Sequence, residues 1–149
     1  MKRLLDIAVS LLALLVLAPV LLLAALAVVL DSGFPVLFRQ TRVGRGGREF
    51  GMYKFRSMVV NAASIGPWHT ADQDPRVTRV GRVLRRTSID ELPQLLNVLL
   101  GDMSLVGPRP DVPAQRALYS EADWQLRCSV RPGITGLAQV LYRSNCTQE

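Results

Sequence analysis

The stretch from Ile7 to Leu30 constrains this chain more than any other feature, because its 24 residues carry no charge. About 20 apolar residues are enough for a helix to cross the hydrocarbon core of a bilayer. Pro19 lies in the middle of the stretch. A proline removes one backbone donor, and its ring clashes with the preceding helical turn. The sequence therefore predicts a membrane helix with a break at Pro19.

The charges that flank this stretch bear on its topology. Lys2 and Arg3 precede it, and six basic residues follow it, opposed only by Asp31 and Glu49: Arg39, Arg42, Arg45, Arg48, Lys54 and Arg56. A simple span would place the second basic segment outside, although basic flanks favour the cytoplasmic face. We therefore predict that residues 1–31 form a re-entrant hairpin that enters and leaves by one face. Residues 32–149 would then form a cytoplasmic domain on the membrane surface.

Three other structures compete for the apolar stretch. A straight spanning helix tolerates a proline when neighbouring groups satisfy the freed carbonyl. A cleaved signal peptide shares the basic start, and Ala25-Leu26-Ala27 matches its cleavage motif, but the stretch is long for one. A buried helix of a soluble protein would show a polar face, and we find none in residues 7–30.

Composition points to anionic partners. The formal net charge is +6, and Lys2 and Lys54 are the only lysines among the basic residues. The planar guanidinium of arginine suits phosphate and carboxylate better than the point charge of lysine does. A basic domain beside a membrane therefore indicates anionic headgroups, phosphorylated substrates or both. Cys128 and Cys146 lack the CxxC spacing of a zinc site, so we expect free thiols.

The rest of the chain predicts one small domain of the α+β class, mostly helical, with a short β-hairpin. Residues 36–43 and 48–58 read as strands joined by a glycine-rich turn. Residues 61–75 read as a loop, in which Asp72-Gln73-Asp74 imitates the D-x-D metal motif of some nucleotide-sugar transferases. That signal is weak, because two aspartates in a loop are common. Arginines at close to helical spacing in residues 76–86 predict a helix or turn with a cationic stripe.

An amphipathic helix follows, because leucines at positions 92, 95, 96 and 99 recur at helical spacing. Its leucine-rich face, residues 92–100, either rests in the membrane interface or forms the core of the domain. Pro93 suits a first helical turn, where its missing N–H costs nothing. This places Asp90 at or near the N-cap and Glu91 just inside the helix.

Two interpretations of Asp90 and Glu91 stand at this point. Aspartate is a common N-cap residue, and Ser88-x-x-Glu91 matches a capping box, so the pair can be purely structural. A helix N-terminus also favours an ionised carboxylate and can hold phosphate. A carboxylate there can attack phosphorus, and its neighbour can hold Mg²⁺, which prefers oxygen ligands.

Four motifs decide between the two interpretations. The segment Thr87-Ser-Ile-Asp-Glu-Leu-Pro-Gln-Leu-Leu-Asn-Val-Leu-Leu-Gly-Asp-Met-Ser-Leu-Val-Gly-Pro-Arg-Pro110 resembles the signature of bacterial monotopic phosphoglycosyl transferases. These enzymes initiate surface glycan assembly. The segments Tyr53-Lys-Phe-Arg-Ser-Met58, Asp74-Pro-Arg-Val-Thr-Arg-Val-Gly81 and Arg131-Pro-Gly-Ile-Thr-Gly-Leu-Ala-Gln-Val140 resemble further family motifs, in the same order.

The resemblance implies a reaction. In this family a sugar phosphate passes from a UDP-sugar to a polyprenol phosphate, usually undecaprenyl phosphate, and UMP is released. The route is ping-pong through a covalent phosphosugar on the aspartate, which the motif places at Asp90. Glu91 would bind the essential Mg²⁺. The location implied is the bacterial inner membrane, among its lipids, with the catalytic domain on the cytoplasmic face.

The resemblance also implies roles for basic residues and for the proline. Arg85 matches the arginine five positions before the nucleophile, and Arg109 matches the arginine of the Pro-Arg-Pro element. Both would hold phosphate groups, as would Lys54 and Arg56. Pro19 matches the hairpin-breaking proline, although Ala18 replaces the serine that often precedes it in the family. The residues after Val140 do not resemble the continuation of relatives.

A function of another class is also open. A membrane-anchored protein could bind anionic lipid through its arginines, or act as a scaffold, without catalysis. The sequence lacks the interleaved aromatic residues of a single-strand nucleic-acid binder, so we expect no nucleic acid as a partner. The alternative predicts binding that does not depend on Asp90, whereas the transferase predicts complete dependence.

Overall fold

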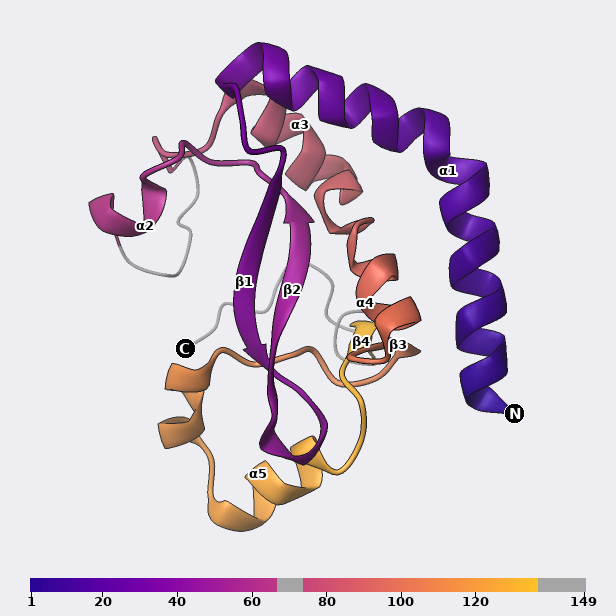
Figure 1. The fold of residues 1–149 in the computed structure, drawn as a ribbon. Coiled ribbons are helices and arrows are strands. Elements are labelled where there is room, and N and C mark those ends of the chain that lie inside the picture. Colours follow the sequence, from indigo (N-terminus) through magenta and orange to yellow (C-terminus); the bar gives the residue numbers. More distant parts are fainter. Residues whose placement is uncertain (67–73, 137–149) are drawn as a thin grey trace. The chain divides into compact units, whose positions relative to one another are not determined.

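The computed structural model describes residues 1–66 and 74–136 (Figure 1). Helices account for 55% of the described residues, and the strands form two two-stranded sheets, which confirms the α+β class. The elements, in chain order, are α1 (Lys2–Ser32), β1 (Leu37–Val43), η1 (Arg45–Gly47), β2 (Glu49–Phe55), α2 (Ala62–Ile65), α3 (Arg79–Thr87), η2 (Ile89–Glu91), α4 (Gln94–Leu100), β3 (Ser104–Val106), η3 (Pro113–Leu118), α5 (Glu121–Cys128) and β4 (Gly133–Thr135).

The first element, α1, is a helix of 31 residues with Pro19 inside it. Within the described part of the chain it is the one helix long and apolar enough to cross a membrane. Only 11% of its most apolar window is buried, and an exposed apolar surface of this size marks a site of contact with a membrane or another protein. α1 therefore has the character of a membrane anchor. Its helical assignment continues through Pro19, so the predicted break does not divide it, and the re-entrant topology stays a prediction.

Contacts divide the chain into two compact units. The first unit comprises Met1–Leu15, Arg39–Met52 and Gln94–Glu149, and the second comprises Val16–Phe38 and Tyr53–Pro93. α1 and both strands of the hairpin therefore contribute residues to each unit. The division does not follow the predicted boundary between residues 31 and 32, which concerns the membrane and stays a prediction.

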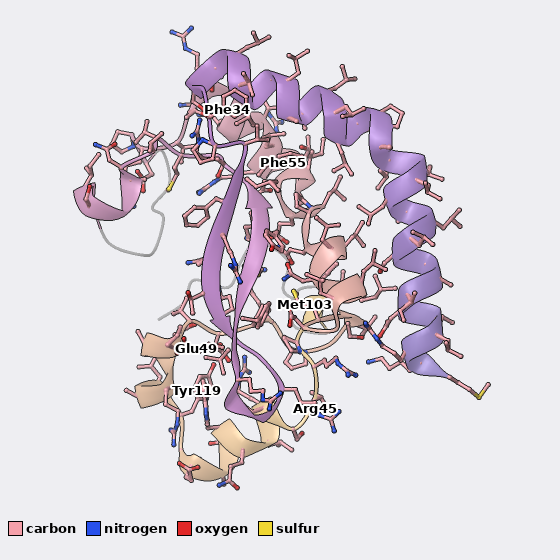
Figure 2. The ribbon with its side chains drawn as sticks, viewed as in Figure 1. Phe34, Arg45, Glu49, Phe55, Met103 and Tyr119 are labelled. Carbon is pink, nitrogen blue, oxygen red and sulfur yellow. The ribbon has the colours of Figure 1, made fainter. Side chains whose placement is uncertain are left out.

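The second unit has a core of four buried residues, Ala24 and Val28 of α1, Phe55 of β2 and Leu84 of α3. Figure 2 labels Phe55 at the end of β2. Val80 and Ile89 pack against this cluster. Burial of this apolar surface fixes the positions of β2 and α3 relative to the C-terminal half of α1.

The first unit has its own core, made by Met52 of β2, Val98 of α4 and Met103. Met103, labelled in Figure 2, lies directly before β3 and is completely buried. β3 pairs in parallel with β4, with Ser104 opposite Gly133 and Val106 opposite Thr135. These two short strands were not predicted, because three residues are too few to show a period of two.

Several predicted boundaries are wrong. The second strand ends at Phe55 rather than at Met58, and the predicted loop of residues 61–75 contains the short helix α2. The helix expected to start at Asp90 starts at Gln94. Pro93 gives the physical reason: it has no N–H to bond the carbonyl of Ile89, and Leu92 N bonds that carbonyl instead, as the last bond of a 3-10 turn.

The leucine-rich face of residues 92–100 divides between the two alternatives. Leu95 is buried and contributes to the interior, as the core interpretation predicts. Leu96 and Leu100 are exposed, as the interfacial interpretation requires. Within α4 the buried positions also include the polar residues Gln94 and Asn97, and Asn97 Nδ2 donates to the carbonyl of Gly51 at 2.8 Å.

Candidate active site

The chain turns just before the carboxylate pair at Ser88, a residue with a left-handed backbone conformation. Ser88 has φ 58° and ψ 16°, and its N–H bonds the carbonyl of Arg85, which ends α3. An L-residue in this conformation costs roughly 1–2 kcal/mol, and such strain is concentrated at functional sites. Ser88 precedes η2, and its side chain makes no cap hydrogen bond there. The capping box predicted for Ser88 and Glu91 is therefore not formed.

Asp90 is a buried carboxylate in the turn that follows. Its exposed fraction is 7%, and Ile89 before it packs on the core of the second unit. Burial raises the pKa of Asp90 above its usual range, while the positive charges of Lys54 and Arg85 act in the opposite direction. Loss of hydration makes a carboxylate oxygen a more reactive nucleophile than it is in water, and the two cations favour its ionised form.

Glu91 forms an ion pair with Lys54. Lys54 Nζ lies 2.8 Å from Glu91 Oε1, and the two side chains are 16% and 22% exposed. Lys54 belongs to β2 and Glu91 to η2, so this contact joins two elements that are far apart in the sequence. The structure thus brings together two residues that the sequence predicted for the same site.

Arg85 lies on the inner side of α3. Its Nε donates to Ser57 Oγ at 2.8 Å, and burial lowers its pKa while Asp90 opposes that shift. Gly81, one helical turn earlier, lies against the backbone of Ser57, where an added Cβ would come 2.0 Å from the carbonyl oxygen. The close approach of α3 to residue 57 therefore needs a glycine, and Arg85 is held where its charge acts on Asp90.

Arg56 holds the end of α1. It is 5% exposed, and its Nη2 donates to the carbonyls of Ser32 and Gly33 at 2.7 and 2.6 Å and to Ser32 Oγ. Its Nε and Nη1 are buried with no hydrogen-bond partner among the described residues. The contact fixes the C-terminal end of α1 to the residue that follows β2. The phosphate-binding role predicted for Arg56 stays a prediction.

The predicted cationic stripe separates into two groups. Arg79, Arg82 and Arg86 are exposed, whereas Arg76 and Arg85 turn inward. Arg76 pairs with Asp74, with 2.6 Å between Nη2 and Oδ2, and also bonds the carbonyl of Ala62. The hydrogen bonds from Arg76 lower the pKa of Asp74 to about 2. Asp74 thus holds Arg76 in the turn before α3, while Asp72 lies outside the described residues.

Arg109 belongs to the first unit and is exposed, between half-buried Pro108 and buried Pro110. Its backbone carbonyl accepts from Arg127 Nη2, and Arg127 Nε also pairs with Asp111 at 2.8 Å. Two shallow pockets border this segment, one lined by Trp124 and Arg127 and the other by Arg42 and Gln94. The other six predicted residues belong to the second unit: Pro19, Lys54, Arg56, Arg85, Asp90 and Glu91.

A polar stripe at the start of α1 was not predicted. Asp6 and Ser10 are buried, with exposed fractions of 4% and 0%. Together with Arg3 they recur at intervals of three and four residues, which places them on one face of the helix. The spacing is present in the sequence, but Arg3 and Asp6 precede the uncharged stretch that begins at Ile7, so hydropathy alone does not connect them with Ser10.

The donor set limits what metal the site could hold. Across residues 1–66 and 74–136, no group of three or more histidine, cysteine or acidic side chains could hold a metal ion. Asp90 and Glu91 offer two carboxylates. Mg²⁺ is commonly bound by one or two carboxylates, with water and substrate phosphates completing its ligands, so these residues fit a magnesium ion that arrives with a phosphorylated substrate.

A family model described as bacterial sugar transferase matches residues 1–149. The chain belongs to the bacterial sugar transferase family. The resemblance found in the sequence motifs is thereby confirmed at the level of the family. Of those motifs, residues 137–140 at the C-terminal end lie outside the described part of the chain, as does Cys146, while Cys128 is a free cysteine.

Curated relatives of this chain include proteins with named activities. An exopolysaccharide production protein of Rhizobium leguminosarum is 53% identical over 146 residues, which cover 94% of this chain and 73% of that protein. A UDP-glucose:undecaprenyl-phosphate glucose-1-phosphate transferase of Caulobacter vibrioides is 54% identical over 141 residues, covering 93% and 53%. A UDP-N-acetylgalactosamine-undecaprenyl-phosphate N-acetylgalactosaminephosphotransferase of Aeromonas hydrophila is 47% identical, covering 95% and 34%. The chain thus spans about half and about a third of the last two.

Proposed function

We propose that this sugar transferase moves a sugar 1-phosphate from a UDP-sugar to undecaprenyl phosphate and releases UMP, as the first membrane step of surface glycan assembly. The names of the relatives from Caulobacter vibrioides and Aeromonas hydrophila support the reaction class. The observation that carries the proposal is the buried carboxylate of Asp90, with Lys54, Arg85 and Glu91 around it.

The reaction consists of two displacements at one phosphorus atom, and Asp90 is the nucleophile of the first and the leaving group of the second. In the first, an Asp90 carboxylate oxygen forms a bond to the β-phosphorus of the UDP-sugar. The bond from that phosphorus to the oxygen bridging the two phosphates breaks, and UMP leaves with the electron pair. In the second, a phosphate oxygen of undecaprenyl phosphate attacks the same phosphorus and Asp90 leaves. The product is undecaprenyl diphosphate sugar, and the carboxylate is regenerated.

Positive charge is needed because an anionic carboxylate approaches an anionic diphosphate. Lys54 and Arg85 supply it next to Asp90, since both lower its pKa and therefore stabilise its ionised form. Arg109 would hold a phosphate group from its exposed position. Glu91 would hold Mg²⁺, which when bound would neutralise phosphate charge.

The contacts at both ends of α1 support the re-entrant topology. Near the N-terminal end, Asp6 accepts hydrogen bonds from Ser104 and Leu105. At the C-terminal end, Ser32 and Gly33 accept from Arg56. Both partners follow α1 in the chain, and residues 33–66 and 74–136 contain no second candidate span. The helix would then enter and leave by the cytoplasmic face of the bacterial inner membrane.

The test is UMP release by the purified chain in detergent, with Mg²⁺, undecaprenyl phosphate and a panel of UDP-sugars. We expect release with one or a few sugars, and none from Asp90→Asn. Asp102→Asn serves as the matched control, because this half-buried carboxylate lies in the turn after α4 and should leave release unchanged. Equal release by wild type and Asp90→Asn would refute Asp90 as the nucleophile, and no release with any sugar would favour the binding or scaffold role.

A further inference from the structure

The N-terminal end of α1 is tied to the first unit by polar side chains. Arg3 donates to the carbonyls of Val98 and Leu99 at 2.5 and 3.0 Å, and Lys2 Nζ donates to the carbonyl of Val106 at 3.0 Å. Arg3 thereby satisfies two of the last carbonyls of α4, where a cation is favoured. Lys2 and Arg3 thus fix the first turn of α1 to β3 and α4.

Asp6 is the most buried charge in this group. Its Oδ2 accepts from Ser104 Oγ at 2.9 Å and its Oδ1 accepts from Leu105 N at 3.3 Å. Both partners belong to β3. A buried carboxylate is stable only when hydrogen bonds replace its hydration, and here a strand 98 residues later supplies them.

The strand held by Asp6 leads directly into the Pro-Arg-Pro segment. β3 ends at Val106, and residues 108–110 follow after a single glycine. The other side of the segment is fixed to β4, since Gly133 N bonds the carbonyl of Pro108 and Gly107 N bonds that of Thr135. An added Cβ on Gly107 would come 2.4 Å from the carbonyl of Arg131, so this region has little freedom to adjust.

We propose that Asp6 is a positioning residue that fixes the Pro108–Pro110 segment to the membrane helix, and so sets the depth at which Arg109 meets a lipid-borne phosphate. The inference rests on the proposed function. The anchor α1 is held by the bilayer, and Asp6 connects its first turns to β3. The acceptor's phosphate stays at headgroup level because its polyprenyl chain stays in the hydrocarbon.

This arrangement predicts an effect on one substrate only. A UDP-sugar arrives from water and can adjust to any depth of Arg109, whereas the acceptor cannot leave the interface. Loss of Asp6 leaves the Ser104 hydroxyl and the Leu105 N–H without a partner, and hydrogen bonds to charged groups contribute about 1.5–3 kcal/mol. We expect KM for undecaprenyl phosphate in nanodiscs to rise about tenfold in Asp6→Ala, which corresponds to ~1.4 kcal/mol. KM for the UDP-sugar should change less than about twofold.

The experiment separates the two half-reactions. UMP released without acceptor measures the first displacement, and turnover with undecaprenyl phosphate in nanodiscs measures the second. Asp6→Ala should keep the acceptor-free UMP burst and lose turnover at low acceptor concentration. With a short-chain, water-soluble polyprenyl phosphate in detergent, the variant should match the wild type. Equal rises in both KM values, or an equal rise for the soluble acceptor, would overturn the proposal.

Two further variants keep the test decisive. Ser104→Ala removes the hydroxyl group that donates to Asp6. It should raise KM for undecaprenyl phosphate by less than Asp6→Ala does, and it should add little to the effect of Asp6→Ala in the double variant. This variant carries the test if Asp6→Ala does not fold.

Ser10→Ala is the matched control, because its buried hydroxyl has no hydrogen-bond partner among the described residues. If the wild type gives no burst that depends on Asp90, the proposed function fails. If that burst is present but Asp6→Ala leaves the acceptor KM unchanged, only the positioning role fails.

Discussion

Lys54 Nζ lies 2.8 Å from Glu91 Oε1, so the lysine predicted to hold phosphate is paired with the carboxylate predicted to hold the metal. Both side chains are mostly buried, which weakens screening by solvent. A cation that binds Glu91 must compete with the Lys54 ammonium. Once displaced from Glu91, that ammonium would be available to a phosphate that arrives with the metal.

Lys54→Met should therefore change metal binding and catalysis in opposite directions. Without substrate, we expect Mg²⁺ to bind at least about threefold more tightly, because even an exposed ion pair contributes up to about 1 kcal/mol and this pair is mostly buried. Catalysis should fall, since a cation beside Asp90 is lost. Calorimetric titration with Mg²⁺ measures the first effect and UMP release the second. Arg82→Met, an exposed cation on α3, is the control, and unchanged Mg²⁺ affinity in Lys54→Met would show that the two cations do not compete.

The raised pKa of Asp90 predicts a pH-dependent cost to stability. Because burial disfavours the ionised form, the folded protein binds a proton at Asp90 more tightly than the unfolded chain does. Protonated Asp90 therefore stabilises the folded state. This contribution is fully present below the pKa of aspartate in the unfolded chain and is lost as the pH rises through the pKa of Asp90 in the folded protein. Asp90→Asn should thus raise Tm at pH 7, and the gain should vanish in acid.

Thermal melts between pH 7 and pH 3 measure this difference. Glu49→Gln replaces an exposed carboxylate on β2 and should leave Tm unchanged across the range. The same raised pKa should appear in the acid limb of UMP release, which requires ionised Asp90. A Tm for Asp90→Asn that stays below the wild type at pH 7 would mean that the ionised carboxylate stabilises the fold.

Asp74 predicts the opposite pH dependence. Its pKa is lowered to about 2 by hydrogen bonds from Arg76. Ionised Asp74 therefore stabilises the folded state. This contribution is present above the pKa of aspartate in the unfolded chain, near 4, and is lost as the pH falls through about 2. Asp74→Asn should therefore lower Tm at pH 7, and the two melting curves should converge as the pH falls from about 4 toward 2. If the two Tm values still differ at pH 2, the lower stability of Asp74→Asn comes from the hydrogen bond with the backbone N–H of Arg76 rather than from the charge of Asp74.

Local patterns in the sequence predicted the β-hairpin and the arginine-bearing helix. The strand at residues 37–43, the turn, the second strand and the arginine-bearing helix all appear close to their expected positions. Lys54 and Glu91 were assigned to one site by motif, and the structure pairs them. The α3–η2 turn was missed because it depends on a left-handed Ser88 and on a proline that interrupts the hydrogen-bond ladder, and neither effect appears in hydrophobic periodicity.

Long-range contacts were the part that the sequence did not predict. The partners of Asp6 lie about 100 residues away, and no local period connects a carboxylate in α1 to the strand at residues 104–106. Arg56 was assigned to phosphate from its strand face, but its contacts with Ser32 and Gly33 depend on where α1 ends in space. Because it is costly to bury a charge without a partner, we can predict that a buried charged residue has one. Which residue that partner is depends on the tertiary fold.

Gly81→Ala tests whether the fit between α3 and residue 57 supports the site. The added Cβ would lie 2.0 Å from the carbonyl oxygen of Ser57, and this atom is backbone that cannot rotate away. Overpacking of this kind costs about 1–3 kcal/mol, so we expect a lower Tm. Displacing α3 also moves Arg85 from Ser57 Oγ, so UMP release should fall at temperatures where the variant is still folded. Arg82→Ala, at the exposed neighbouring position, should change neither quantity. If Gly81→Ala melts at a lower temperature but retains full activity, the position of Arg85 does not depend on this contact.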